Sequence, residues 1–404
     1  MDRLQAAILE LEKVERQIFA ALARSPIRDL HESRARGELK ALFKRSLGVD
    51  LISKPVINSG VLRQIDLPGC SLQLLHGESW PQCPLSAHLF LPDTAPPWPV
   101  VLVCCGHGAG GKFEYNAMGL RLARQGAAAL IPDNLGQGER QPMGHRDLTA
   151  PFDCGFSVQA LIVQETLAWI EWLKKDSRFT RIAAAGNSGG GLLTMCLAAL
   201  SDDLQAIASS GYPSSFELIA RKQKRHCHCN LIPGCIGRYE MWEIYSLFAP
   251  KPLLLMQGEN DILFSCDSFL ACARRVRDVY KQFQAEDNYA SRLEPGMHSW
   301  DENRRSVIGE FFARHLSLRQ PEPEDEAQLE LSGPALASCL PNWPADAIDA
   351  EALAWRLAGK SPRPSRKLWE IYAPELDCPM PPVSERGDTE QILAQMKCFM
   401  ADLA

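Results

Sequence analysis

A glycine-flanked serine is the strongest chemical signal in the sequence. It lies in residues 186–190, which read Gly-Asn-Ser-Gly-Gly. The apolar run Ile182–Ala185 leads into this pattern, and a second apolar run, Gly189–Leu200, leads out of it. Small neighbours permit the strained strand-to-helix turn that lifts a serine oxygen above the edge of a sheet. Tight glycine turns with an incidental serine also occur, so it is the flanking strand and helix that favour Ser188 as a nucleophile.

An acid that supports this serine is expected further along the chain. Asp261 follows the apolar run Pro252–Met256, at the predicted carboxyl end of a strand. Catalytic groups of parallel sheets gather at that edge. Glu259 is a weaker competitor for the same role, and the alternative role for Asp261 is that of a loop cap.

A base must remove the proton of the serine hydroxyl, because the hydroxyl alone is a poor nucleophile. Only two histidines, His298 and His315, follow Asp261. His298 comes after the last predicted strand, whereas His315 lies inside the closing helix and is expected to be a surface or packing residue. We therefore expect His298 to be the general base and Asp261 to hold its ring.

Amide donors for an oxyanion are expected at two places. The first is the backbone N–H of Gly189, directly after the nucleophile. The second is the loop 106–111 (Gly-His-Gly-Ala-Gly-Gly), whose glycines let the backbone approach a substrate closely. Ala109 is the preferred donor in this loop and Gly108 the alternative; the loop is otherwise only a flexible turn.

These motifs together resemble the α/β-hydrolase superfamily, in its acetyl xylan esterase and dienelactone hydrolase-like branch. Residues 132–140 resemble that branch's loop after the fourth strand, and residues 230–234 and 247–254 resemble its run into the strand that carries the acid. The likeness covers about residues 70–318. The motifs that carry it, in chain order, are His107-Gly108, Gly186-x-Ser188-x-Gly190, Gly258-x-x-Asp261 and Gly296-x-His298.

The resemblance implies hydrolysis of a carboxylic ester through an acyl-serine intermediate. The acyl group is expected to be small, such as acetyl on a sugar or a metabolite, and the substrate a small molecule. No cofactor is needed, because the triad and the amide donors supply the chemistry. The same residues also serve thioesterases and peptidases. A non-catalytic binding protein of this fold remains the alternative of a different class, although no triad residue is missing.

Two other groups of residues are candidates for a functional role. Residues 226–229 read His-Cys-His-Cys, with Cys235 nearby. Neighbouring residues in a single cluster rarely close a tetrahedral zinc site, so no metal is expected there. Asp133, Glu139 and Arg140 either line the pocket or, as we favour, form ion pairs that stabilise their loop.

The predicted elements place these residues in an α/β fold with a mostly parallel sheet and helices on both faces. We expect an N-terminal helical segment at 1–69, a catalytic domain at 70–318, and an acidic linker with a helical extension at 319–404. The predicted strands are Ser71–Leu75, Ala87–Leu91, Pro99–Cys105, Ala127–Ile131, Ile182–Ala185, Ala206–Ser209, Pro252–Met256 and Tyr289–Leu293. The predicted helices are Glu38–Leu47, Asn116–Gln125, Gln159–Lys174, Gly189–Leu200, Trp300–His315, Ala350–Leu357 and Thr389–Leu403.

Composition agrees with a large globular protein. The 404 residues are 46% hydrophobic and 23% charged. The net charge is -6, whereas a nucleic-acid-binding protein typically has an excess of basic residues. The pattern of apolar residues predicts neither an export signal nor a membrane span. Its 14 cysteines are scattered and several lie in apolar runs, so we expect reduced thiols in a cytoplasmic protein, with a homo-oligomer possible.

Overall fold

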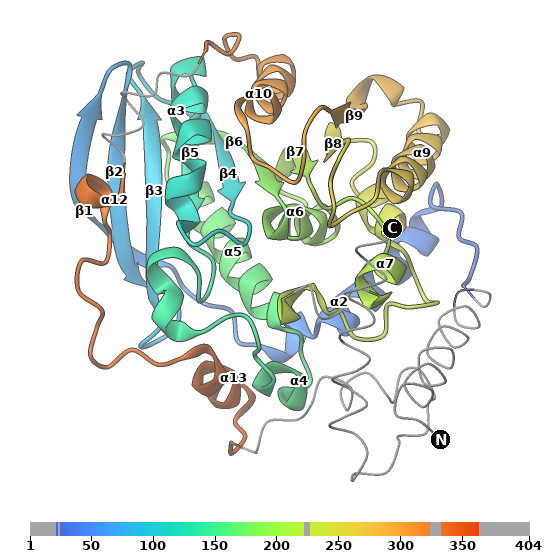
Figure 1. The fold of residues 1–404 in the computed structure, drawn as a ribbon, viewed down its shortest axis with the longest axis horizontal. Coiled ribbons are helices and arrows are strands. Elements are labelled where there is room, and N and C mark those ends of the chain that lie inside the picture. Colours follow the sequence, from blue (N-terminus) through green and yellow to red (C-terminus); the bar gives the residue numbers. More distant parts are fainter. Residues whose placement is uncertain (1–21, 23–24, 222–226, 324–332, 363–404) are drawn as a thin grey trace.

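A nine-stranded sheet forms the centre of the computed structural model, which describes residues 22, 25–221, 227–323 and 333–362 (Figure 1). The strand order is β1-β2-β3-β5-β4-β6-β7-β8-β9. The strands from β1 to β3 pair antiparallel, as do β3 and β5. The remaining pairs are parallel. This confirms the α/β class and the mostly parallel sheet predicted from the sequence.

The strands are β1 (Asn58–Leu67), β2 (Cys70–Glu78), β3 (Pro84–Pro92), β4 (Trp98–Cys104), β5 (Ala128–Pro132), β6 (Phe179–Asn187), β7 (Leu204–Ser210), β8 (Leu253–Gly258) and β9 (Tyr289–Glu294). The α-helices in the described ranges are α2 (Ser33–Leu47), α3 (Asn116–Gln125), α4 (Ala150–Cys154), α5 (Val158–Lys175), α6 (Gly189–Leu200), α7 (Phe216–Arg221), α8 (Met241–Ser246), α9 (Cys266–Gln282), α10 (Glu302–Leu316), α12 (Pro334–Ala337) and α13 (Ala350–Ala358). Short 3-10 helices include η2 (Gly111–Tyr115), η3 (Gly138–Met143) and η5 (His228–Asn230).

Both faces of the sheet are covered, which explains its unbroken apolar strands. In β4, Val100 and Leu102 belong to one core, which α5, α6 and α9 help to form. Val101 and Val103 point the other way, into a second core built with α3 and α10. Figure 1 shows α6 and α10 on opposite sides of β7. Because successive side chains alternate between the faces, a strand buried on both faces reads as a continuous hydrophobic run.

The sheet begins earlier than the sequence analysis predicts. Asn58–Leu67 form β1 and pair with β2, although we expected residues 1–69 to be helical. β1 lies at the sheet edge and is mostly exposed, so it lacks the apolar run that marked the inner strands. The helix predicted at Glu38–Leu47 is present as the end of α2, whose Leu39, Phe43 and Leu47 are buried in the main core.

The C-terminal extension packs on the catalytic fold as far as it is described. In α13, Leu353 and Ala354 are fully buried in the main core. Glu351 accepts hydrogen bonds from the backbone amides of Thr149 and Ala150, at 2.7 and 2.6 Å. Residues 333–362 therefore share the hydrophobic core of the hydrolase fold. The predicted helix Thr389–Leu403 lies outside the described residues.

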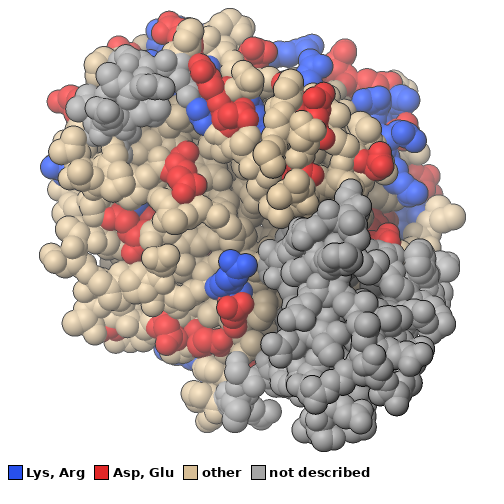
Figure 2. Space-filling model, in the orientation of Figure 1, with Lys and Arg blue, Asp and Glu red and all other residues tan. Residues whose placement is uncertain are grey.

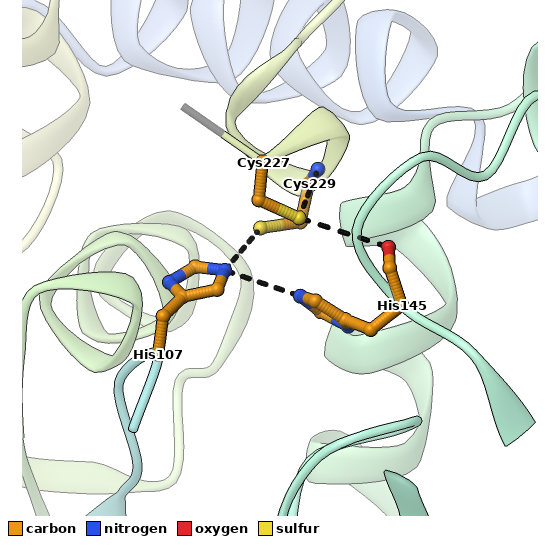
Figure 3. A group of neighbouring side chains, drawn as sticks. All are labelled: His107, His145, Cys227 and Cys229. Carbon is orange, nitrogen blue, oxygen red and sulfur yellow. Dashed lines mark hydrogen bonds between the residues drawn. The ribbon is translucent and has the colours of Figure 1, made fainter. Parts of the chain in front are cut away.

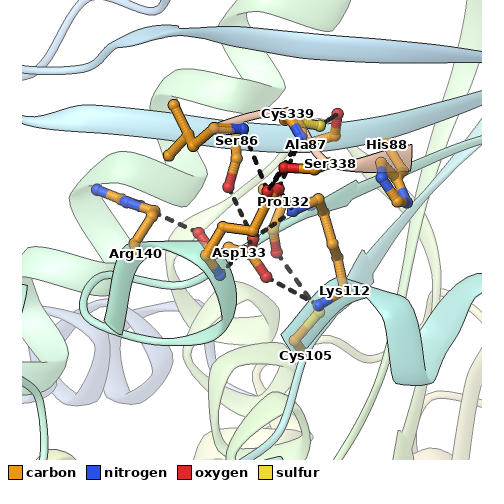
Figure 4. Close-up of polar contacts among 12 residues, drawn as sticks. Ser86, Ala87, His88, Cys105, Lys112, Pro132, Asp133, Arg140, Ser338 and Cys339 are labelled. Atoms are coloured by element: carbon orange, nitrogen blue, oxygen red, sulfur yellow. Dashed lines mark hydrogen bonds and ion pairs between the residues drawn. The ribbon is translucent and has the colours of Figure 1, made fainter. Parts of the chain in front are cut away.

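A buried ion-pair network ties this extension to the loop after β5 (Figure 4). Lys112 is fully buried, and its Nζ donates to Asp133 Oδ2 at 2.6 Å and also to Glu139. Burial opposes the charge of Lys112, but the two carboxylates raise its pKa overall. Glu139 in turn accepts hydrogen bonds from the Ser338 hydroxyl and the Cys339 amide. The acidic residues predicted to stabilise their loop thus do so by ion pairing.

Arg140 forms a second buried pair, with Glu165 of α5. Its Nη1 and Nη2 donate to the two carboxylate oxygens at 2.6 and 2.8 Å, and the Arg140 side chain is fully buried.

We expect Arg140→Met to lower the free energy of unfolding by about 3–5 kcal/mol, because it leaves the Glu165 carboxylate without its ion-pair partner in the core. Arg178→Met breaks a partly exposed pair with Asp176 and should cost about 0–1 kcal/mol. Urea denaturation of both variants measures the difference, and equal losses would contradict the prediction.

On the face in Figure 2, acidic and basic side chains lie interspersed among uncharged ones. Within the described residues, no helix combines the length and the apolar character needed to cross a membrane. The 12 cysteines in those ranges are all free thiols, in agreement with the expectation of reduced cysteines.

Candidate active site

Ser188 lies in a sharp turn between β6 and α6. Its backbone has φ 60° and ψ -120°, a conformation that side chains other than glycine rarely adopt. The flanking positions require glycine, because a side chain there would clash with the backbone. A Cβ on Gly190 would lie 2.0 Å from the carbonyl oxygen of Cys104, and one on Gly186 would lie 2.4 Å from that of Gly190. The turn is held by the Ser188 amide, which donates to the Ser210 carbonyl at 2.9 Å. This is the geometry predicted for a nucleophile elbow.

Asp261 and His298 form a hydrogen-bonded pair beside this turn. His298 Nδ1 lies 2.7 Å from Asp261 Oδ2, and the aspartate side chain is fully buried. The other oxygen, Oδ1, accepts from the amides of Leu263 and Phe264 at 2.8 and 3.1 Å. An acceptor at Nδ1 fixes the tautomer, so that Nε2 of the neutral ring is free to accept a proton.

The two residues that competed for these roles lie elsewhere. Glu259 is exposed, and the hydrogen bond to the His298 ring comes from Asp261 instead. His315 lies in α10, where its ring packs against Phe311 with centroids 4.7 Å apart. The pKa of His315 is lowered by burial, as expected for a packing residue. The structure therefore brings together the acid and the base preferred in the sequence analysis.

Arg304 of α10 holds the loop that carries His298. It is buried and donates to the carbonyl oxygens of Met297 and Ser299, one on each side of the histidine. The sequence analysis missed this residue, because its partners are backbone atoms that leave no pattern in the sequence.

Removing this guanidinium should misplace His298 without changing the binding surface. We expect Arg304→Met to lower kcat for an ester substrate by about 100-fold and to leave KM nearly unchanged, since small displacements of a catalytic group cost rates of this order. Arg314→Met, on the exposed side of the same helix, is the matched control and should retain activity. A loss that appears mainly in KM would contradict this positioning role.

Two backbone amides are placed to hold an oxyanion. Gly189 is the first residue of α6, so its amide has no acceptor within the helix and lies at the positive end of the helix dipole. In the loop after β4, the Gly108 amide is already bonded to the Gly106 carbonyl at 3.1 Å. Among the described residues no hydrogen bond from the Ala109 amide is present, and Ala109 lines the cavity. The geometry thus favours Ala109 over Gly108.

A cavity of about 510 Å³ opens over Ser188 and His298. Tyr212, Leu263 and Phe264 give it an apolar side. The rest of the lining is polar and glycine-rich; it comprises His107, Gly108, Ala109, Gly136, Gln137, Gly138, Gln141, Gly144, His145, Arg146, Cys227 and Asn230. This mixture suits a polar ligand with a small apolar part.

Four potential metal ligands converge at the rim of this cavity (Figure 3). They are His107, His145, Cys227 and Cys229, and one ligand atom from each lies within 4.8 Å of all the others. The sequence analysis grouped Cys227 and Cys229 with His226, His228 and Cys235 instead, and expected no metal. His228 turns away to the Leu148 carbonyl, Cys235 lies outside the cluster, and His226 lies outside the described residues. Both histidines of the cluster come from distant loops, which the spacing within residues 226–229 does not reveal.

Comparison with known proteins identifies similar hydrolases. Residues 85–284 match the model of the dienelactone hydrolase family. A relative in Bacillus subtilis (strain 168), the candidate hydrolase YtaP, is 23% identical over 215 residues, which is 48% of this chain and 71% of that protein.

Solved structures share the fold. The methylesterase BT1017 is 21% identical, with a TM-score of 0.61, over 80% of this chain and 74% of that chain. A candidate acetyl xylan esterase from Bacteroides fragilis NCTC 9343 is 16% identical, with a TM-score of 0.52, over 67% and 78% of the two chains. At these identities the structures show the fold alone. The match to the dienelactone hydrolase family model covers residues 85–284, just under half of the chain, and the sheet has the α/β fold of these solved esterases.

Proposed function

We propose that this protein is a serine hydrolase that cleaves a carboxylic ester through an acyl-serine intermediate. The observation that carries the proposal is the arrangement around one cavity of Ser188, in its strained turn, and His298, whose ring is bonded to the buried Asp261. A buried acid, an oriented imidazole and a serine at a helix N-terminus are the parts that acyl transfer needs.

The first half of the reaction acylates the serine. Ser188 Oγ attacks the ester carbonyl while His298 Nε2 removes its proton. The resulting oxyanion accepts hydrogen bonds from the amides of Gly189 and Ala109. Asp261 stabilises the imidazolium that forms. His298 then gives the proton to the alkoxide leaving group, and the alcohol departs.

Water completes the cycle in the second half. His298 removes a proton from a water molecule, which attacks the acyl carbonyl, and the same two amides hold the second oxyanion. Collapse of this intermediate breaks the acyl bond to Ser188, and His298 returns the proton to Oγ. The carboxylic acid leaves and the enzyme is restored.

The cavity favours a small acyl group on a polar alcohol. Phe264 and Tyr212 offer apolar contact, while Gln137, Gln141 and Asn230 offer hydrogen-bonding groups. Such a lining suits an acyl ester of a sugar or of another hydroxylated metabolite better than a long-chain lipid ester. This class of substrate is also the one that the sequence resemblance implies.

A fluorophosphonate probe tests the proposal directly, because it forms a covalent bond only with an activated serine. We expect stoichiometric labelling of the wild-type protein, with the adduct on the peptide that contains Ser188 in a mass-spectrometric digest. A folded wild-type protein that remains unlabelled, or a label on another serine, would refute the proposal and favour a binding protein of this fold.

Thioester and amide cleavage are distinguished from ester cleavage by a substrate panel. We expect p-nitrophenyl acetate to be turned over faster than acyl-CoA thioesters and peptide anilides of matched acyl length. Faster turnover of the thioesters would assign the same residues to a thioesterase.

A further inference from the structure

Two imidazoles and two thiols lie close together beside the active site. His107 comes from the loop after β4, His145 from the loop after η3, and Cys227 and Cys229 from the segment around η5. In Figure 3 the four side chains, from three separate parts of the chain, point toward one another. We propose that His107, His145, Cys227 and Cys229 bind one zinc ion.

The distances fit a single ion. His107 Nε2 lies 3.1 Å from His145 Nε2 and 3.1 Å from Cys229 Sγ. Zinc binds nitrogen at about 2.0–2.1 Å and thiolate sulfur at about 2.3 Å, so the ligand atoms of a tetrahedral site are about 3.3–3.8 Å apart. The two quoted distances are within a few tenths of an ångström of this spacing, and all four ligand atoms lie within 4.8 Å of one another.

The orientation of the His145 ring suits a metal ligand. Its Nδ1 lies 2.8 Å from the Leu135 carbonyl oxygen, which accepts hydrogen bonds only. The Nδ1 atom of His145 therefore carries the proton, and its Nε2 presents a lone pair that lies 3.1 Å from His107 Nε2 and 3.1 Å from the side-chain amide nitrogen of Gln137. A backbone carbonyl on the far nitrogen is the usual partner of a metal-bound histidine.

The donor set selects zinc among the common metals. Two thiolates and two imidazoles are soft and borderline ligands, which suit zinc and disfavour magnesium and calcium. Four protein ligands also leave no open position for a substrate or a water molecule, so the site is structural in character. Cys227 and Cys229 are buried, at 7% and 2% exposure, which limits the access of solvent and oxidants to the sulfur atoms.

The position of the site indicates that a bound ion would stabilise the loops around the oxyanion donors. A Cβ on Gly189 would lie 2.6 Å from the ring of His107, so this imidazole packs directly against one oxyanion donor. His107 is also two residues before Ala109, the other donor. An ion here would tie three loops together: the loop of the oxyanion donors, the loop of His145, and the segment of Cys227 and Cys229, all of which contribute to the cavity.

Metal analysis of the full chain tests the site. Protein produced in zinc-supplemented medium and passed through a desalting column should contain one zinc ion per chain by plasma mass spectrometry. His145→Ala and the double variant Cys227→Ser/Cys229→Ser should lower zinc affinity by at least about 100-fold. Cys235→Ser, in the same segment but outside the cluster, is the matched control and should keep its zinc. Wild-type protein without zinc, or variants with undiminished zinc, would overturn the proposal.

A spectroscopic measurement covers the case in which a variant fails to fold. Wild-type protein is stripped with a chelator and titrated with cobalt(II). A tetrahedral site with thiolates should show intense visible bands and a sulfur-to-cobalt charge-transfer band that saturate at one equivalent and disappear when zinc is added. Weak octahedral-type bands, or no saturation, would reject the site.

The effect on reactivity is a separate arm that depends on the proposed function. Because the ion would hold the loop of Ala109, stripping it should slow fluorophosphonate labelling about tenfold, and zinc should restore the rate. Zinc content and cobalt spectra do not depend on Ser188. A failure of the hydrolase proposal and a failure of the zinc proposal are therefore distinguishable.

Discussion

Ser188→Ala should lower kcat for p-nitrophenyl acetate by about 10⁴- to 10⁶-fold, the loss seen when a triad member is removed from an enzyme of this type. Among the described residues that line the cavity, Ser188 is the only serine. What activity remains would come from the amides of Gly189 and Ala109 and from substrate binding. Stopped-flow or steady-state absorbance of the released nitrophenolate gives the rate.

The control for this variant is another buried serine. Ser214→Ala removes a hydroxyl that is hydrogen-bonded to Ser268 and does not line the cavity, so it should keep kcat within about threefold of the wild type while costing about 1 kcal/mol of stability. Circular dichroism of both variants checks that they fold. Ser188→Ala protein that folds and hydrolyses the ester at the wild-type rate would remove this serine from the mechanism.

Asp261→Asn should produce the second large loss, a fall in kcat of about 10⁴-fold. The Oδ2 atom of Asp261 accepts the His298 Nδ1 proton at 2.7 Å, and its Oδ1 atom is held by the amides of Leu263 and Phe264. Those two amides would retain the amide oxygen of an asparagine. Its NH₂ group would then face Nδ1 and drive the proton to Nε2, which can no longer take the proton of the serine.

Glu259→Gln is the matched control, because it neutralises a carboxylate two residues away that is exposed to solvent. Its kcat should change by less than about threefold, in line with the small effect of surface charges. The pH profile separates the roles further: Asp261→Asn should regain part of its rate at high pH, where hydroxide replaces the missing base. An equal loss in Glu259→Gln would show that the acid was assigned wrongly.

The inner elements of the fold were predicted well from the sequence. The helices Asn116–Gln125 and Gly189–Leu200 have the bounds that the apolar pattern indicated. The strands that precede them, β4 and β6, are largely buried and therefore give long apolar runs in the sequence. β1 was missed, because an exposed edge strand has no such run and its stability comes from pairing with β2.

The sequence by itself determined the order of the chemical groups: a serine in a glycine turn, then an acid after a strand, then a histidine after the last strand. Local rules suffice for this, since steric limits on the turn and the apolar period of its neighbours act over a few residues. The tertiary structure decided what depends on contacts between distant segments. It paired His298 with Asp261 and not with Glu259, and it placed Arg304 against the backbone on both sides of His298. It also brought His107 and His145 to two cysteines that lie more than eighty residues later in the chain. Such contacts follow from how the sheet and its loops close in space, and no short-range pattern in the sequence encodes them.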